Sequence, residues 1–215
     1  MIILDEVMNE ILLKVVLMFD LTIINHNKAI EALISGDHHL ALEVIESDEK
    51  INQLEQQINY DVMLAIAKHQ PVARDLRYLI AMIKVANDVE RIGDYAKSNA
   101  KTAIINSDRT FLTTIFLKNM KRMGDIIARL LEDSKQAFLN VDVDKAYSLV
   151  REDNSLVKIL NETLENNPFE EIKDNNVESF VSINGVIRTL ERTRGHLANI
   201  CEATIFVGNG EFVEL

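Results

Sequence analysis

The chain has 215 residues, of which 47% are hydrophobic and 27% charged, a composition typical of a folded globular protein with a sizeable core. Its net charge of −11 is spread evenly, because residues 1–107 carry 10 basic and 16 acidic side chains and residues 108–215 carry 13 and 18. The lack of a basic segment argues against nucleic-acid binding and against attraction to a membrane surface. Only seven glycines and two prolines are present, which excludes a many-stranded sheet and favours a few long helices.

Apolar residues recur at spacings of three and four along almost the whole chain, the pattern of amphipathic helices. This spacing predicts six helices, over residues 5–33, 37–68, 71–106, 108–139, 142–165 and 177–208. Between the first two, Gly36 is a helix stop and Asp37 an N-cap; Pro71 is expected at the first position of the third helix. Asp108 and Asp142 are expected to cap the fourth and fifth helices.

The six predicted helices form two sets of three that look like an internal repeat. Asp48 recurs as Asp153 at an offset of 105 residues, and Glu90 recurs as Glu191 at an offset of 101. We therefore predict an all-α fold of two tandem three-helix bundles, one after the other, with the first over residues 1–107 and the second over 108–215.

The apolar stripe of the third predicted helix is interrupted by acids. At 100° per residue, Asn87, Glu90 and Asp94 fall on the same stripe as the core leucines and isoleucines. The second helix carries Asp48 and Asn52 one turn apart beside its own stripe. A buried carboxylate must be neutralised, paired or coordinated. Facing helices that carry carboxylates are one way to build a metal site in a bundle.

A salt bridge is the alternative explanation of these acids, since Arg77, Lys84 and Arg91 lie within reach on the same helix. Two oxygen-rich pairs at core positions nevertheless raise the metal hypothesis, and oxygen ligands suit hard divalent cations or iron.

The remaining candidate ligands add little to this hypothesis. No histidine follows a glutamate by three residues, so the Glu-x-x-His motif of di-iron bundles is absent. His38 and His39 fall in a first helical turn and are expected to be exposed. Cys201, the single cysteine, excludes a disulfide framework and is expected in the core. No glycine-rich phosphate loop or G-x-S-x-G motif is present.

The run from Gln70 to Arg77, followed by Lys84 and by Glu90-Arg91-Ile92-Gly93-Asp94, resembles the signature of the PhoU family. Leu190-Glu191-Arg192 and the closing Val207-Gly208-Asn209-Gly210-Glu211 resemble the second repeat of that family more loosely. The resemblance extends over nearly the whole chain. It implies two three-helix bundles and metal ions (Fe, Zn, Mg or Mn) held by E/D-x-x-x-D pairs.

By this resemblance, Glu90 and Asp94 match the metal motif, and Asp48 and Asn52 match its partner on the second helix. The second repeat departs from the motif: Val157 follows Asp153 where an acid is usual, and Gly195 follows Glu191 in place of aspartate. We therefore expect a filled first site and a weak or absent second site at Asp153 and Glu191.

The resemblance also implies a function and partners. We expect a cytoplasmic regulatory adaptor that negatively controls phosphate uptake and phosphate-starvation signalling. Its expected partners are the ATPase subunit of a phosphate ABC transporter and a phosphate sensor histidine kinase, through which it could lie at the inner membrane; a homodimer is a further expectation. Two alternatives stay open: an accessory protein of a low-affinity phosphate permease, and a carboxylate-bridged metalloenzyme. The adaptor reading predicts no catalysis.

Overall fold

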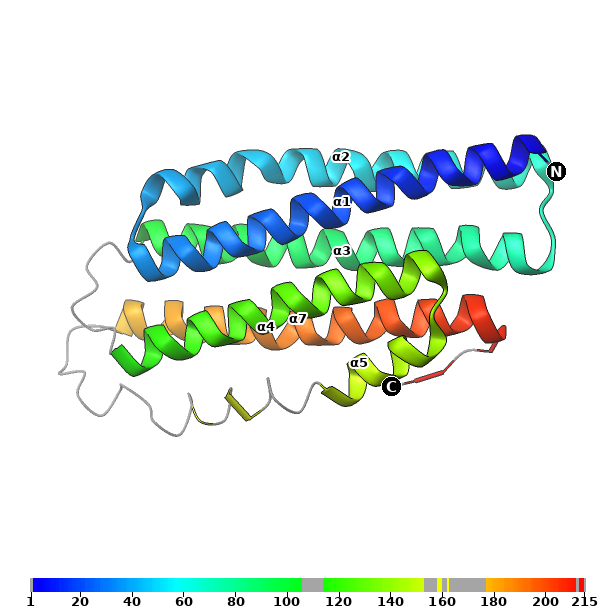
Figure 1. Cartoon of the computed structure of the whole chain (residues 1–215). Coiled ribbons are helices and arrows are strands. Elements are labelled where there is room, and N and C mark those ends of the chain that lie inside the picture. Colours follow the sequence, from blue (N-terminus) through cyan, green and yellow to red (C-terminus); the bar gives the residue numbers. More distant parts are fainter. Residues whose placement is uncertain are drawn as a thin grey trace.

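The computed structural model describes residues 2–105, 114–152, 158–159, 162, 177–211 and 213–214. Within this part of the chain all regular structure is helical and no strand occurs, as the apolar spacing predicted. The helices whose bounds are described are α1 (Ile2–Ser35), α2 (His38–His69), α3 (Ala73–Ile105), α4 (Thr114–Asn140), α5 (Val143–Glu152) and α7 (Val177–Asn209) (Figure 1).

The helices form two bundles that lie side by side. The first bundle consists of α1, α2 and α3, which all contact one another, and the second of α4, α5 and α7. Helix α1 packs on α4, and α3 packs on α7, so the two bundles share long flanks (Figure 1). The predicted boundary between residues 107 and 108 lies within residues 106–113, outside the described residues.

Local sequence explains where the helices begin and end. Gly36 follows α1 with φ of 75°, which favours glycine. The Asp37 side chain then caps α2 by accepting hydrogen bonds from the backbone N–H groups of His39 and Leu40. Asp142 caps α5 by accepting from the backbone of Lys145 at 2.9 Å. These stops and caps are as predicted; Asp108, the cap expected for α4, lies outside the described residues.

Helix α3 begins two residues later than the sequence suggested. Gln70 and Ala73 both adopt left-handed φ values, 47° and 48°, and Pro71 lies between them in the connection. The chain reverses direction there within three residues, so the fixed φ of the proline serves the turn and not the first helical turn. The later part of the predicted fifth helix, beyond Glu152, falls mostly outside the described residues.

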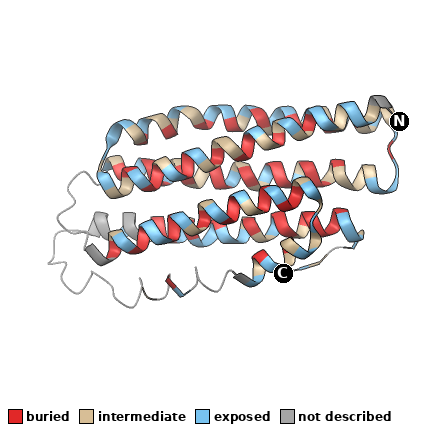
Figure 2. Ribbon diagram, in the orientation of Figure 1, coloured by how far each residue is buried: buried red, intermediate tan, exposed pale blue. Residues whose placement is uncertain are grey.

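The hydrophobic core is continuous through both bundles and the contact between them. Buried positions face inward on every long helix and also on the flanks where the bundles meet (Figure 2). The largest fully buried side chains come from both bundles and include Phe19, Met82, Ile127 and Phe138. Cys201 is 2% exposed, as expected of a core cysteine, and burial raises the pKa of its thiol to about 11.

Candidate metal centre

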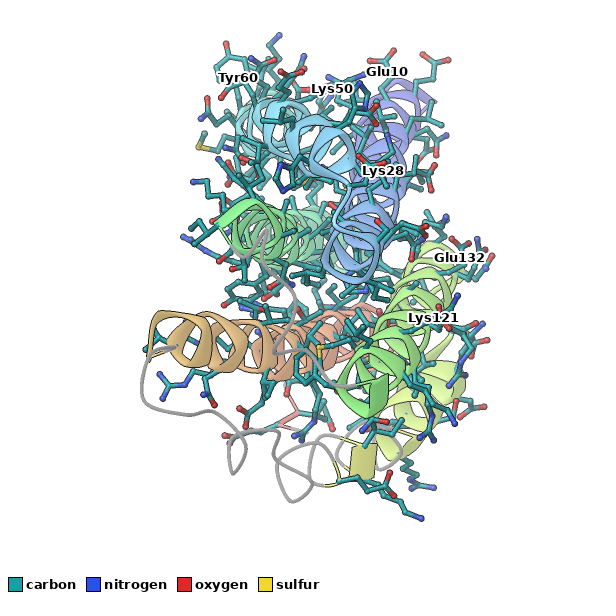
Figure 3. The ribbon with its side chains drawn as sticks, turned by 90° about the vertical axis from the view of Figure 1, so that its left-hand side faces the viewer. Glu10, Lys28, Lys50, Tyr60, Lys121 and Glu132 are labelled. Carbon is teal, nitrogen blue, oxygen red and sulfur yellow. The ribbon has the colours of Figure 1, made fainter. Side chains whose placement is uncertain are left out.

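Asp48 and Lys135 are buried, unlike most charged side chains of the described residues, which lie on the outside of the molecule. Figure 3 shows this for Glu10, Lys50 and Lys121, which lie at the periphery of the two bundles. Asp48 is only 1% exposed, because it lies on the face of α2 that packs in the first bundle. A carboxylate so far from water is costly unless something compensates its charge.

Two contacts fix how α2 and α3 face each other. The Lys97 ammonium donates to Asp48 Oδ2 at 2.5 Å, and the side-chain amides of Asn59 and Asn87 lie 3.4 Å apart. The two helices run antiparallel, so this register places Asn52 opposite Asp94 and Glu55 opposite Glu90. We call this polar strip the α2–α3 seam; its residues are Asp48, Asn52, Glu55 and Asn59 on α2 and Asn87, Glu90, Asp94 and Lys97 on α3.

Glu90 occupies the middle of the seam. Its side chain is 19% exposed. Burial raises the pKa of the Glu90 carboxyl, and the neighbouring carboxylates of Asp94, Glu55 and Asp48 raise it further, while Arg91 opposes them. The direction of this shift means that Glu90 is ionised at a cost in the folded chain, first because it is partly removed from water and then because other carboxylates surround it.

The cations of the seam compensate only part of this charge. Arg91 approaches Glu90 at 3.5 Å and Asp94 at 3.3 Å, but it is 60% exposed, so the pairing is weak. Counting four carboxylates (Asp48, Glu55, Glu90 and Asp94) against two cations (Lys97 and Arg91) leaves two negative charges. One divalent cation would neutralise that remainder.

Several buried oxygens of the seam have no hydrogen-bond partner. Oδ1 of Asp48, Oδ1 of Asn52 and Oδ1 of Asn59 are all buried and unpaired. A lone pair left without a donor or a cation costs about 1–3 kcal/mol. Hard cations prefer carboxylate and amide oxygens. The chemistry of the seam therefore fits an oxygen-bound metal ion.

The side chains of the seam are nevertheless not arranged around one point, as the ligands of a bound metal ion would be. Among the described residues, no three His, Cys, Asp or Glu side chains are grouped so that they could hold one ion. The four predicted residues Asp48, Asn52, Glu90 and Asp94 do lie along one seam, with Lys97 bonded to the deepest of them. Metal binding there would require side chains to move closer together.

Sequence reasoning missed three members of the seam: Glu55, Asn59 and Lys97. Glu55 and Asn59 repeat the four-residue spacing of Asp48 and Asn52 one and two turns further along the same face of α2. With its nitrogen facing the carboxylate, the Asn87 amide donates to Glu55 at 2.8 Å. Lys97, three residues after Asp94, lies on the acidic face of α3. The i, i+3, i+4 spacing could have found all three.

The salt-bridge alternative is true in part. Arg91 does pair with Glu90 and Asp94. Arg77 and Lys84 point elsewhere, since the Arg77 guanidinium lies beside Gly210 and the Lys84 ammonium lies 5.8 Å from the centre of the Phe206 ring.

The second predicted site has a different environment. Glu191 on α7 is exposed, whereas its counterpart Glu90 is largely buried. Gly195 supplies no side chain, and the space where its Cβ would stand is open. Asp153 lies outside the described residues. A weak or absent second site therefore stays a prediction.

No histidine belongs to a cluster of potential metal ligands among the described residues. His38 and His39 are exposed, as expected. His26 is buried on α1 and its Nε2–H donates to the carbonyl oxygen of Gly124 on α4 at 3.1 Å. His196 on α7 bonds Asp88 on α3 at 2.7 Å, where the bundles meet.

Comparison with known proteins agrees with the fold and with the repeat. The family model of the PhoU domain matches residues 15–103 and again residues 120–204. The two matched segments begin 105 residues apart and end 101 residues apart, which are the two offsets read from the sequence.

Curated relatives carry names that refer to phosphate transport. The chain is 30% identical over 187 residues to the phosphate-specific transport system accessory protein PhoU homolog 1 of Thermotoga maritima, covering 86% of this chain and 80% of that protein. It is 32% identical to the PhoU homolog of Clostridium acetobutylicum, covering 86% and 84%.

Solved structures share the whole fold. The crystal structure of PhoU from Pseudomonas aeruginosa superposes with a TM-score of 0.88 at 28% identity, covering 96% of this chain and 99% of that one. The phosphate transport system regulatory protein PhoU from Streptococcus pneumoniae superposes with a TM-score of 0.89 at 25% identity, covering 99% and 100%. The structure thus defines the class of this protein: it is an all-α protein of two helical bundles, with a polar seam in the first bundle. The chain belongs to the PhoU family.

No helix in the described part of the chain is long and apolar enough to cross a membrane.

Proposed function

We propose that this protein is a metal-binding regulatory adaptor that negatively controls phosphate uptake and phosphate-starvation signalling. The observation that carries the proposal is the excess negative charge and the unpaired oxygens of the α2–α3 seam, in a chain whose relatives are named accessory proteins of phosphate-specific transport. The role is not catalytic, and the protein acts in the cytoplasm.

Asp48, Asn52, Glu90 and Asp94 would hold the metal ion through their side-chain oxygens. When bound, the ion would supply positive charge to the seam and a cross-link between α2 and α3. All four donors are oxygens, which favours Mg²⁺, Mn²⁺ or iron over Zn²⁺. The chain's own part is to hold these side chains along two packed helices, from the buried Asp48 to the partly exposed Asp94, within reach of one ion once they move closer together.

The proposed partners are the ATPase subunit of a phosphate ABC transporter and a phosphate sensor histidine kinase. The net charge of −11 favours a basic partner surface, and such contacts weaken as salt increases. A peripheral position at the inner membrane would follow from these partners.

A pull-down from cells grown in high and in low phosphate tests the adaptor role. We expect the ATPase or the kinase to be retained, with less retention at high salt, and we expect the purified protein to carry metal by elemental analysis. Retention of a low-affinity permease in their place would move the function to that transporter. Turnover of a phosphoester by the metal-loaded protein would overturn the non-catalytic role.

A further inference from the structure

The deepest carboxylate of the seam already has a cation bonded to it, and that cation belongs to the chain. The Lys97 ammonium lies 2.5 Å from Asp48 Oδ2 and joins α3 to α2. Asp48 is 1% exposed, whereas the Lys97 side chain is 29% exposed, so the lysine enters the seam from its solvent edge. The remaining oxygen of Asp48 is buried and unpaired.

We propose that Lys97 is a built-in competitor of the metal ion: its ammonium occupies Asp48 in the metal-free protein, and a metal ion binds only by displacing it. This inference rests on the proposed metal site. It adds that the affinity of the site is set by the lysine as well as by the ligands.

Charge and geometry support this competition. A divalent ion on either oxygen of the Asp48 carboxylate would lie only a few ångströms from an ammonium bonded to Oδ2, and the two cations would repel each other strongly away from bulk water. Lys97 is the cation nearest to Asp48, and it reaches the carboxylate from α3 while Asp48 lies on α2. Its long, flexible stem can swing from the solvent edge into water without disturbing α3.

Displacement of the Lys97 ammonium would change the charge of the protein surface. When a metal ion takes Asp48, the Lys97 charge moves from the seam into solvent on the flank of α3. Metal occupancy therefore changes which charge the first bundle presents to a partner.

A matched pair of variants tests the competition. Lys97→Met keeps the apolar stem and removes the ammonium, whereas Lys101→Met removes an exposed lysine one turn further along the same helix. Mn²⁺ binding is measured by the loss of the free-ion signal in electron paramagnetic resonance, and unfolding temperature is measured in chelator. Lys97→Met should bind Mn²⁺ roughly tenfold or more tightly than the unchanged protein, because a charge-assisted hydrogen bond no longer has to be broken. It should also unfold at a lower temperature in chelator, and Lys101→Met should change neither quantity.

A second variant covers the case in which the buried Asp48 does not tolerate methionine. Lys97→Gln leaves an amide donor for Asp48 without a charge, and it should also tighten Mn²⁺ binding, while Lys97→Arg should restore weak binding. Acetylation by a water-soluble ester, followed by mass spectrometry, should label Lys97 faster in the unchanged protein once Mn²⁺ is added.

The outcomes separate the two proposals. Equal or weaker Mn²⁺ binding by Lys97→Met and Lys97→Gln overturns the competition while leaving the metal site intact. Binding by the variants but not by the unchanged protein supports the competition and overturns metal binding as the native function. No binding by any of the proteins overturns both.

Discussion

The α2–α3 seam and the contact between the two bundles both bury polar side chains, but the two regions differ in how many of these side chains have a hydrogen-bond partner. At the contact between the bundles, several buried donors meet acceptors: His26 donates to Gly124, and Lys135 bridges Asp20 and Glu132 at 2.8 and 2.6 Å. Arg77 Nε, beside Gly210, is a single buried donor without a partner there, whereas the unpaired oxygens of the seam are clustered. In the seam, acids face acids and several oxygens have no partner. Buried polar groups that are satisfied hold a fold together, whereas a cluster left unsatisfied indicates a missing ligand.

The bundle contact also contains a small polar network on the α3–α7 flank. Asp88 accepts from His196 and from Asn199 at 2.7 and 2.9 Å, and the Tyr95 hydroxyl lies 3.2 Å from the other ring nitrogen of His196. Each of these groups has a neighbour of complementary character, so the network needs no further ligand to explain it.

The largest expected effect is loss of metal from the seam. The double change Glu90→Ala with Asp94→Ala removes two of the three predicted carboxylate ligands, so we expect it to abolish most bound metal. Glu191→Ala removes the exposed counterpart in the second bundle and should change the metal content little. Elemental analysis of the purified proteins measures both. Equal loss from the two variants would show that the second bundle also binds metal.

The next largest effect is a loss of stability in acid that comes from His26, at the contact between the bundles. Burial lowers the pKa of His26 from its ordinary 6.5 to about 4, against the weaker pull of Gly124 and Asp125. The unfolded chain therefore takes up a proton at a higher pH than the folded chain. The stability from this site is complete above pH 6.5 and is lost as the pH falls towards 4.

Comparing urea unfolding at pH 7 and pH 4.5 tests this reasoning. Between these pH values, the free energy of unfolding of the unchanged protein should fall by roughly 2–3 kcal/mol more than that of the His26→Gln variant, because glutamine does not titrate. Carboxylates that titrate in the same range act on both proteins and cancel. An equal loss in both would show that His26 does not couple acid to the bundle contact.

A pair of glycine substitutions tests where the helices touch. A Cβ at Gly124 would stand 2.8 Å from a stiff Ile30 side chain, so α1 and α4 approach closely there. A Cβ at Gly195 would meet open space. We expect Gly124→Val to lower the free energy of unfolding by about 2 kcal/mol. Gly195→Ala should raise it by up to about 1 kcal/mol through helix propensity. Thermal unfolding measures both, and a stable Gly124→Val protein would contradict the close approach.

Much of the fold could be predicted from the sequence because it depends on local chemistry. The period of apolar residues gives the helices, and Gly36, Asp37 and Asp142 mark their ends through backbone preferences that need no tertiary partner. The start of α3 could not be predicted, since the left-handed Gln70 and Ala73 follow from how α2 must meet α3. The side-by-side packing of the bundles likewise depends on long-range contacts.

The site was predictable only in part. The acids at core positions are visible in the helical period, and they do lie along one seam. What the sequence could not supply is which cation faces which acid: the expected partners were Arg77, Lys84 and Arg91, but Asp48 is bonded by Lys97 from another helix. Such pairings depend on the antiparallel register of α2 and α3, which only the folded chain fixes.

The smallest effect, and the sharpest test of the comparison, concerns Glu90. Its folded-state pKa is raised, first by burial and then by the neighbouring Asp94, so the folded chain holds the proton more tightly than the unfolded chain. Ionised Glu90 therefore costs stability at neutral pH, and that cost disappears as the pH falls through the raised pKa. This sign is opposite to that of His26, because one group is buried as an acid and the other as a base.

Glu90→Gln should accordingly raise the unfolding temperature of the metal-free protein slightly at pH 7. The difference from the unchanged protein should vanish in acid, where the carboxyl is already neutral. With Mn²⁺ added the order should reverse, since glutamine is a poorer ligand and the variant gains less from the metal. Thermal unfolding in chelator and in Mn²⁺, at pH 7 and at pH 4, measures all three differences. A metal-free Glu90→Gln protein that is less stable than the unchanged protein at pH 7 would mean that Arg91 compensates the Glu90 charge more fully than the exposure of Arg91 suggests. The seam would then resemble the paired polar groups at the contact between the bundles.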